Sequence, residues 1–334
     1  MSCPPPSPFD WNAFRFDPRS RRGHVESYFF KLNDAEGRRA LWLKATVLSD
    51  GSGSEGAVAE AWAIACDREG EHVAVKQTVP YSQSRFSTTG LDIEVGGLRI
   101  RDGVVQGEIE QAGRRIAVDL TFTKGAPPLI PFPERALYVS RLPRSKLVSP
   151  YPDSRFNGSY TVNGETISVS DAHGMQGHNW GESHAHLYAW GHCNQWDQDE
   201  DFVFEGVSAR VKLGPVVTPL ATLVCIRHRG VRYDFNRVRD ILRNHGEVSH
   251  RRWAFRAESD LGRIEGELFG QTPDFVGLHY PNPDGAMTYC LNTKLAHARI
   301  RFEPKGRLPM TLTSRTAALE VGTREPDHGI RMYV

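Results

Sequence analysis

Short apolar runs with a period of two residues recur along this 334-residue chain and constrain its fold more than any other feature. Between Leu91 and Val95, and again between Ile116 and Phe122, apolar side chains alternate with polar or small ones. Further short runs lie at 62–66, 73–79, 160–162, 166–170, 253–258, 264–269 and 298–302. Gly, Asp or Asn interrupts the pattern about every ten residues, which is typical of antiparallel sandwiches and barrels. We therefore predict an all-β protein.

Helical periodicity is weak by comparison. It is confined to residues 133–141 and 238–244, which we predict to be short helices. The 31 glycines and 21 prolines are spread along the chain rather than gathered in a low-complexity tract. This distribution favours many short elements joined by turns.

Proline content marks a boundary in the middle of the chain. Seven prolines lie between residues 127 and 153, a density that a central strand does not tolerate. We predict an N-terminal β-domain at 1–126, a proline-rich connection at 127–153 and a C-terminal β-domain at 154–334. The alternative is one continuous sandwich with a long surface crossover.

The charge balance and the termini exclude several classes of protein. Forty-one Lys and Arg against 40 Asp and Glu give a net charge of +1, without the clustered basic excess of nucleic-acid binders. No apolar run reaches the roughly 18 residues of a transmembrane helix, although peripheral contact with a membrane stays open. The Met1–Pro6 segment lacks the apolar centre of a secretory signal. Five scattered cysteines without a CxxC pair indicate reduced thiols, so we predict a cytoplasmic protein.

A row of ring-bearing and polar side chains occupies alternate positions from residue 184 to residue 196. Its members are His184, His186, Tyr188, Trp190, His192, Asn194 and Trp196. Because alternate residues of a strand share a face, this row would suit the wall of a ligand pocket. The alternative is a polar exterior face with partly exposed aromatic residues. The row is long for one strand, so we expect a bulge or break near Gly191.

The same row raises the alternative of a metal site built on His184 and His186. The side chains that would complete such a site are His178, His192, Glu182 and Glu205. The spacing is loose and no second motif completes the set, so we favour ordinary hydrogen-bonded histidines and predict no metal or other cofactor. The chain also lacks a GxSxG motif, which disfavours a serine hydrolase. The closely spaced glycines between residues 51 and 56 belong to a Ser- and Gly-rich hairpin tip rather than to a phosphate-binding loop, which disfavours a nucleotide-binding protein.

Several of these residues resemble the tocopherol cyclase family. The matching elements are His178-Asn179-Trp180-Gly181, Cys193-Asn194 followed by Trp196, Leu223–Ile226, Gly230 and Tyr233–Phe235. Residues 23–31, Gly-His-Val-Glu-Ser-Tyr-Phe-Phe-Lys, are similar to the family's Glu-Gly-Trp-Tyr-Phe-Lys segment, with Ser27 where glycine is usual. The tocopherol cyclase family is grouped with the carotenoid 1,2-hydratases (hydroxyneurosporene synthases) and the fungal lipocalin-like Diels–Alderases. The resemblance implies two lipocalin-like barrels or sandwiches packed together, with an apolar ligand in or between them.

The cyclisation and hydration reactions for which these families are named set chemical requirements for a site. Cyclising a prenylated phenol or hydrating a polyene starts with protonation of a carbon–carbon double bond, which needs a neutral buried carboxylic acid or an imidazolium. The resulting carbocation needs aromatic faces and the exclusion of water. The candidate proton donors are Glu26, which matches the family's Glu, together with Glu182 and His178. The candidate substrate-binding residues are Tyr28, Trp180, Tyr188, Trp190, His192, Asn194, Trp196, Tyr280 and Asn292.

We therefore predict a cofactor-independent cyclase, hydratase or isomerase, of the lyase or isomerase class, that binds a hydrophobic small molecule. Its substrate would be an isoprenoid of the carotenoid or prenyl-quinol type, or a polyketide-like compound. A pericyclase is one alternative, because confinement and a few hydrogen bonds suffice for it. The others are a non-catalytic carrier or sensor of a hydrophobic metabolite and, with less support, a metal-dependent β-barrel enzyme.

Overall fold

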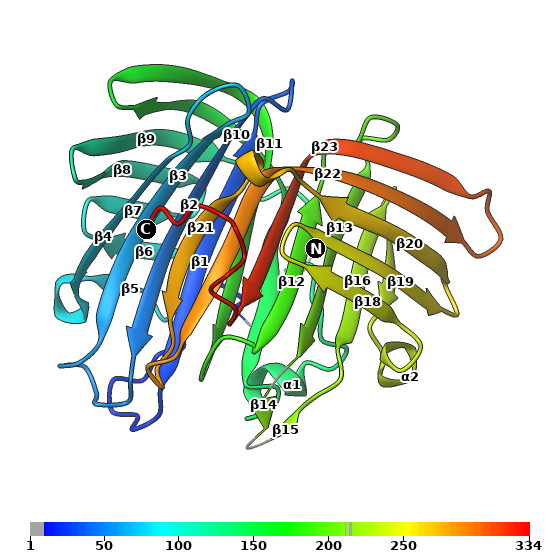
Figure 1. The fold of residues 1–334 in the computed structure, drawn as a ribbon, viewed down its shortest axis with the longest axis horizontal. Coiled ribbons are helices and arrows are strands. Elements are labelled where there is room, and N and C mark those ends of the chain that lie inside the picture. Colours follow the sequence, from blue (N-terminus) through cyan, green and yellow to red (C-terminus); the bar gives the residue numbers. More distant parts are fainter. Residues whose placement is uncertain (1–9, 211, 214–215) are drawn as a thin grey trace, which may run out of the picture.

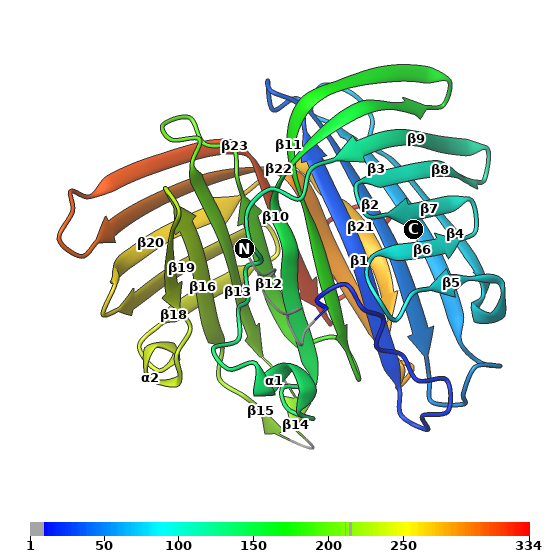
Figure 2. The same cartoon turned by 180° about the vertical axis from the view of Figure 1, so that it is seen from behind.

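Two large antiparallel β-sheets make up most of the protein (Figures 1 and 2). The structure is a computed structural model that describes residues 10–210, 212–213 and 216–334. The sheets confirm the predicted fold class of an all-β protein with two lipocalin-like units. The two predicted helical segments contain the four-residue helices α1 (Ala136–Val139) and α2 (Val238–Ile241). Within the described residues, no helix has the length and apolar character that crossing a membrane requires.

The first sheet contains eleven strands within the described residues, in the order β4-β3-β2-β1-β11-β10-β9-β8-β7-β6-β5. They are β1 (His24–Asn33), β2 (Arg39–Ser49), β3 (Val58–Asp67), β4 (Val73–Pro80), β5 (Arg85–Phe86), β6 (Asp92–Val95), β7 (Leu98–Arg101), β8 (Val104–Gln111), β9 (Arg114–Phe122), β10 (Ser145–Val162) and β11 (Glu165–Gly181). The sheet curls until β4 contacts β8 and β9. It thereby encloses an apolar core that includes Tyr28, Phe30 and Phe156.

The second sheet follows the order β17-β16-β13-β12-β23-β22-β20-β19-β18, with β21 paired to β22. Its strands are β12 (Leu187–Cys193), β13 (Phe202–Arg210), β16 (Ala221–His228), β17 (Val231–Phe235), β18 (His245–Ser249), β19 (Arg252–Ser259), β20 (Gly262–Phe269), β21 (Val276–Pro281), β22 (Met287–Pro304) and β23 (Met310–Thr323). The remaining elements are the two-stranded sheet of β14 (Lys212–Leu213) and β15 (Val216–Val217) and the 3-10 helices Tyr81–Gln83 and Thr272–Asp274. This sheet also curls, so that β16 contacts β18 and β19. Phe204, Trp253 and Phe302 belong to its core.

The division between the sheets falls between β11 and β12, later in the sequence than the predicted boundary. β11 pairs with β1 and β10 pairs with β9, so residues 145–181 belong to the first sheet. The prediction of a C-terminal domain that starts at residue 154 is corrected accordingly. β10 accommodates Pro150 and Pro152 because its register with β11 is interrupted by bulges at these positions. In addition, β9 pairs with β10 only from Phe156 onward.

The strand that carries the predicted row runs straight through Gly191, which corrects the expected bulge or break. Gly191 pairs in continuous register with Gly206 of β13 and Leu319 of β23. A Cβ atom at residue 191 would lie 2.5 Å from Leu268 Cδ2 and 2.9 Å from Trp253 Cζ3. Glycine at this position therefore makes room for the buried Trp253 side chain.

Side chains of both sheets meet in a third cluster between them. Phe29 and Trp42 from the first sheet pack there with Trp190, Tyr280 and Leu295 from the second. Strand alternation explains the arrangement, because the residues of β1 that flank Phe29 face the core of the first sheet instead. Polar side chains also lie at this interface, which is the region that contains the candidate site.

The cysteines of the described residues are reduced. Cys66, Cys193, Cys225 and Cys290 are all buried and free. Burial raises the pKa of both the Cys66 and the Cys290 thiols to about 12. These thiols therefore behave as small apolar core residues rather than as nucleophiles. The fifth cysteine, Cys3, lies outside the described residues.

Candidate ligand cavity and buried carboxylates

A cavity of about 290 Å³ lies between the two sheets. Aromatic side chains from both sheets form much of its lining: Phe29, Trp42, Trp180, Tyr188, Trp190 and Tyr280. The ionisable lining residues besides tyrosine are Lys44, Lys146, His184 and Glu320. Small-molecule sites are typically apolar cavities of roughly 300–1,000 Å³ with a few placed polar groups. The cavity is therefore compatible with a small hydrophobic ligand.

Only part of the predicted row of alternating residues lines the cavity. His184, Tyr188 and Trp190 line the cavity. His192 lies deeper in the interface, where its Nε2 bonds the Pro152 carbonyl oxygen at 2.7 Å. His186 lies before β12 and its backbone N–H donates to the Arg210 carbonyl at 2.9 Å.

The last two residues of the row, Asn194 and Trp196, do not line the cavity. Asn194 is buried and donates from Nδ2 to the Gly174 carbonyl of the first sheet at 2.8 Å. Trp196 lies beyond the end of β12 and packs edge-on against Phe202 in the core of the second sheet. Of the other predicted binding residues, Tyr280 lines the cavity. Asn292 lies behind it, with Nδ2 at 3.4 Å from Glu320 Oε1.

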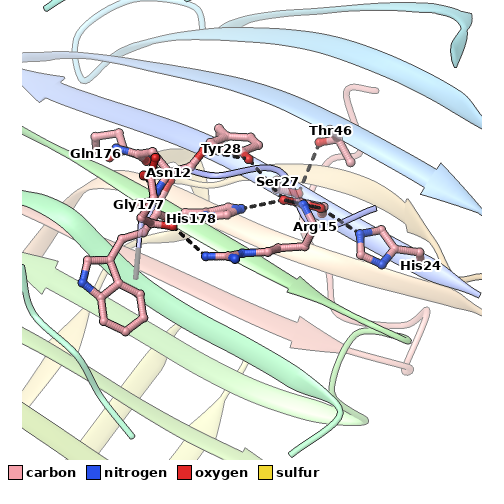
Figure 3. Close-up of polar contacts among 12 residues, drawn as sticks. Asn12, Arg15, His24, Ser27, Tyr28, Thr46, Gln176, Gly177 and His178 are labelled. Carbon is pink, nitrogen blue, oxygen red and sulfur yellow. Dashed lines mark hydrogen bonds and ion pairs between the residues drawn. The ribbon is translucent and has the colours of Figure 1, made fainter. Parts of the chain in front are cut away.

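Glu26 lies on the opposite face of β1 from the cavity, inside the first sheet, and is fully buried. Its carboxylate accepts hydrogen bonds from Tyr28 Oη at 3.1 Å and from the Arg15 backbone N–H at 3.0 and 3.1 Å. His178 Nε2 lies 2.9 Å from Oε1 and His24 Nε2 lies 2.8 Å from Oε2. Figure 3 shows these donors directed toward one carboxylate. We call this group of five residues the Glu26 network.

The Glu26 network stabilises an ionised carboxylate. Burial alone would raise the pKa of Glu26, but the hydrogen bonds from His178 and His24 lower this pKa to about 2. Nδ1 of His178 faces the Trp11 carbonyl oxygen at 2.6 Å. Both ring nitrogens of His178 therefore face oxygen atoms that can accept a hydrogen bond. Glu26 is thus an ionised carboxylate, which differs from the expected neutral acid.

Trp180 separates the Glu26 network from the cavity. Its indole ring lines the cavity on one side and lies 4.7 Å from the His178 ring, between centroids. The Tyr28 ring stacks on His178 at 4.1 Å within the first sheet. Of the predicted catalytic and binding residues, Glu26, His178, Tyr28 and Trp180 are therefore brought together.

The third predicted proton donor, Glu182, lies apart from this group. Its side chain is 26% exposed and forms ion pairs with three guanidinium groups. These belong to Arg22 at 3.7 Å, Arg141 at 3.6 Å and Arg144 at 3.4 Å. Glu182 is thus engaged with three cations and is not part of the cavity lining.

A buried carboxylic acid does adjoin the cavity at Glu205. Trp190 Nε1 donates to Glu205 Oε1 at 3.0 Å and Ser149 Oγ donates to the same oxygen at 2.7 Å. Burial raises the pKa of Glu205 to about 7, against the opposing effect of these hydrogen bonds. Glu205 does not line the cavity but positions the Trp190 indole that does. A glutamate within the apolar run Phe202–Val207 is the sequence signal for such a group.

The histidines of the metal alternative are not gathered into one group. Burial lowers the pKa of His184 to about 3, so its ring is neutral in the cavity. In the part of the chain that the structure describes, no three His, Cys, Asp or Glu side chains lie close enough to hold a metal ion. His178 is engaged with Glu26, and His192 with Pro152.

The fold and the cavity define a two-sheet, lipocalin-like protein with room for a small hydrophobic ligand. A model of the tocopherol cyclase-like family matches residues 146–323, more than half of the chain, and the chain belongs to this family. Uncharacterized proteins of two Mycobacterium tuberculosis strains, CDC 1551/Oshkosh and H37Rv, are each 28% identical over 310 residues. These alignments cover 92% of this chain and 88% of each relative.

Solved structures share the architecture at low sequence identity. An AttH-like protein of Nitrosomonas europaea superimposes with a TM-score of 0.56 at 13% identity, covering 93% of this chain and 97% of that one. Kievitone hydratase of Nectria haematococca superimposes with a TM-score of 0.52 at 11% identity, covering 91% and 90%. Likeness at these identities establishes the fold and leaves the reaction to be argued from the site.

Proposed function

We propose that this protein is a cofactor-independent cyclase, hydratase or isomerase whose substrate is a hydrophobic isoprenoid or polyketide-like molecule. The main observation behind the proposal is the apolar, aromatic-lined cavity between the two sheets. Such a cavity can exclude water from a carbocation and offer ring faces to it. Membership of the tocopherol cyclase-like family and the fold shared with kievitone hydratase support a reaction of this class.

In the proposed reaction, the imidazolium of His178 supplies the proton that adds to a carbon–carbon double bond of the substrate. Glu26 keeps His178 protonated through their 2.9 Å contact. The carbocation that forms is then closed by an internal nucleophile or captured by water, which returns one proton to the protein. Because Trp180 lies between His178 and the cavity, this proton transfer requires the indole to move aside.

The test begins with the ligand itself. Native mass spectrometry and organic extraction of the purified protein would identify a co-purifying lipophile. Turnover is then measured with that compound and with a panel of prenylated quinols, polyenes and polyketide-like compounds. We expect Glu26→Gln to abolish turnover, because the variant lacks the charge that holds the proton on His178. Ligand affinity should persist, because Glu26 does not contact the cavity.

The surface variant Glu182→Gln is the matched control, and its turnover should equal that of the wild type. Unchanged turnover in Glu26→Gln would contradict acid catalysis and favour a pericyclase. Tight binding without turnover of any compound in the panel would instead indicate a carrier or sensor. This second candidate function is favoured by one observation, the position of Glu26 and His178 behind Trp180.

A further inference from the structure

Lys44 of β2 is a buried cation in the cavity lining. Its side chain is 4% exposed, and its Nζ lies 3.7 Å from the ring centroid of Tyr280. The rings of Trp42 and Trp62 also lie near Nζ, with centroids at 5.7 and 5.6 Å. Across residues 10–210, 212–213 and 216–334, we find neither a hydrogen bond nor an ion pair for this ammonium group. The aromatic rings are therefore its close contacts.

The charges around Lys44 leave one positive charge in excess. Lys294 pairs with Glu320 at 2.7 Å, and Lys76 pairs with Glu60 at 3.6 Å. Together with Lys44, these groups comprise three cations and two anions, while His184 is neutral. A buried charge without a partner is costly, so such a site favours a ligand that supplies the missing anion.

The three rings around Lys44 each have a polar atom that lacks a partner. Trp42 Nε1, Trp62 Nε1 and Tyr280 Oη are buried and form no hydrogen bond with any residue that the structure describes. Their side chains are at most 4% exposed. Buried donors of this kind are normally satisfied, and a carboxylate, with two oxygens and about four acceptor positions, matches a group of donors.

Lys44 lines two neighbouring cavities. A small recess of about 10 Å³ adjoins the large cavity, and both are lined by Val25, Lys44, His184 and Tyr280. A head group at Lys44 would therefore lie at the junction. The apolar body of the same ligand would extend into the larger space along Phe29 and Trp190.

We propose that the inter-sheet cavity takes an amphipathic carboxylic acid, with its carboxylate bound by Lys44 and its hydrocarbon body held between the two sheets. This inference rests on the proposed use of the cavity for a hydrophobic ligand and specifies the head group of that ligand. The Tyr280 hydroxyl and the indole N–H groups of Trp42 and Trp62 are the further donors available to the carboxylate.

The test compares three probes of one chain length: decanoate, 1-decanol and decyltrimethylammonium. Isothermal titration calorimetry with the full chain should show decanoate binding roughly ten- to a hundredfold more tightly than 1-decanol, the usual range for a charge-assisted hydrogen bond. Decyltrimethylammonium should bind most weakly. Lys44→Met should abolish the preference for decanoate and leave 1-decanol binding unchanged. Lys124→Met is the control, because Lys124 is an exposed lysine that pairs with Asp102 at 2.6 Å and does not line the cavity, and it should retain the preference.

A measurement on the wild type keeps the proposal testable if Lys44→Met fails to fold. Burial lowers the pKa of Lys44 to about 8, and a bound carboxylate should raise it. Decanoate binding at pH 8.5–9 should therefore take up protons, as seen by titrating in buffers of different ionisation enthalpy. The other groups that act on Lys44 are Glu320, Cys290, Glu60 and Lys294, and His184 and Tyr280 line the cavity beside it.

The outcomes separate this inference from the proposed function. Equal binding of decanoate and 1-decanol, no proton uptake, or a decanoate preference that survives Lys44→Met would each overturn the carboxylate site. If 1-decanol binds in these cases, the proposal that the cavity holds a hydrophobic ligand would still stand. Failure of all three probes to bind would refute both the carboxylate site and the hydrophobic cavity.

Discussion

The buried carboxyl group of Glu205 should make the stability of this protein depend on pH in a defined direction. In the folded state its pKa is raised to about 7 by burial, whereas its ordinary value is 4.5. Between these two values the unfolded chain loses the proton while the folded chain keeps it. The stabilisation from Glu205 is therefore fully present below pH 4.5 and is lost as the pH rises through 7.

The expected magnitude follows from the pKa difference. About 2.5 pH units separate 4.5 from 7, and each unit corresponds to about 1.4 kcal/mol. Wild-type stability should thus decrease by about 3 kcal/mol across this interval relative to Glu205→Gln, which does not titrate. The glutamine retains a carbonyl oxygen that can accept the hydrogen bonds from Trp190 and Ser149.

The assay is urea unfolding of both proteins at pH 4.5, 6 and 8. Subtracting the variant's free energy of unfolding from that of the wild type cancels the titrations that the two proteins share. Glu110→Gln on the exposed side of β8 controls for the chemistry of the substitution. A pH-independent difference for Glu205→Gln, or one that grows with pH, would refute the reasoning.

Three further predictions concern other parts of the molecule. Because the folded pKa of Glu26 is lowered to about 2 from 4.5, its stabilisation is present above pH 4.5 and lost as the pH falls through 2. Glu26→Gln should therefore unfold more readily than the wild type at pH 7, and circular dichroism should show the difference shrinking below pH 4.5. Gly191→Ala should lower the free energy of unfolding by about 1–3 kcal/mol in urea titrations, because its methyl group would collide with Trp253. Tyr280→Phe should leave the ligand-free protein as stable or slightly more stable, because the buried hydroxyl forms no hydrogen bond with the described residues. The same variant should weaken decanoate binding in calorimetry, and unchanged affinity would exclude the hydroxyl as a carboxylate donor.

The all-β architecture could be predicted because strand alternation is a local property of the sequence. The position of the boundary could not be predicted in the same way. Whether a strand tolerates proline depends on whether the neighbouring strand requires a hydrogen bond from that backbone position. Pro150 and Pro152 lie at bulges, where the regular pairing with β11 is interrupted. The pairing of β1 with β11 joins residues about 150 positions apart, as Glu26 and Trp180 show, and no local pattern specifies it.

Part of the candidate site could also be predicted from strand alternation. Alternation indicates that Tyr188 and Trp190 share one face, and the structure places both in the cavity lining. The charge state of Glu26 depends on His178, which approaches through long-range pairing. The local signal for Lys44 is its place within the apolar strand β2, where a lysine is unusual.

The topology also has a consequence for synthesis on the ribosome. Strands of the first sheet all come from residues 24–181, and those of the second from residues 187–323, so the first sheet can form before the second has emerged. Lys31 and Asn33, which later bond the carbonyls of Thr316 and Lys294, would meanwhile be hydrated. The first sheet would then expose ammonium and amide groups on the face that later packs against the second sheet. Such a face associates less readily with other chains than an entirely apolar face would.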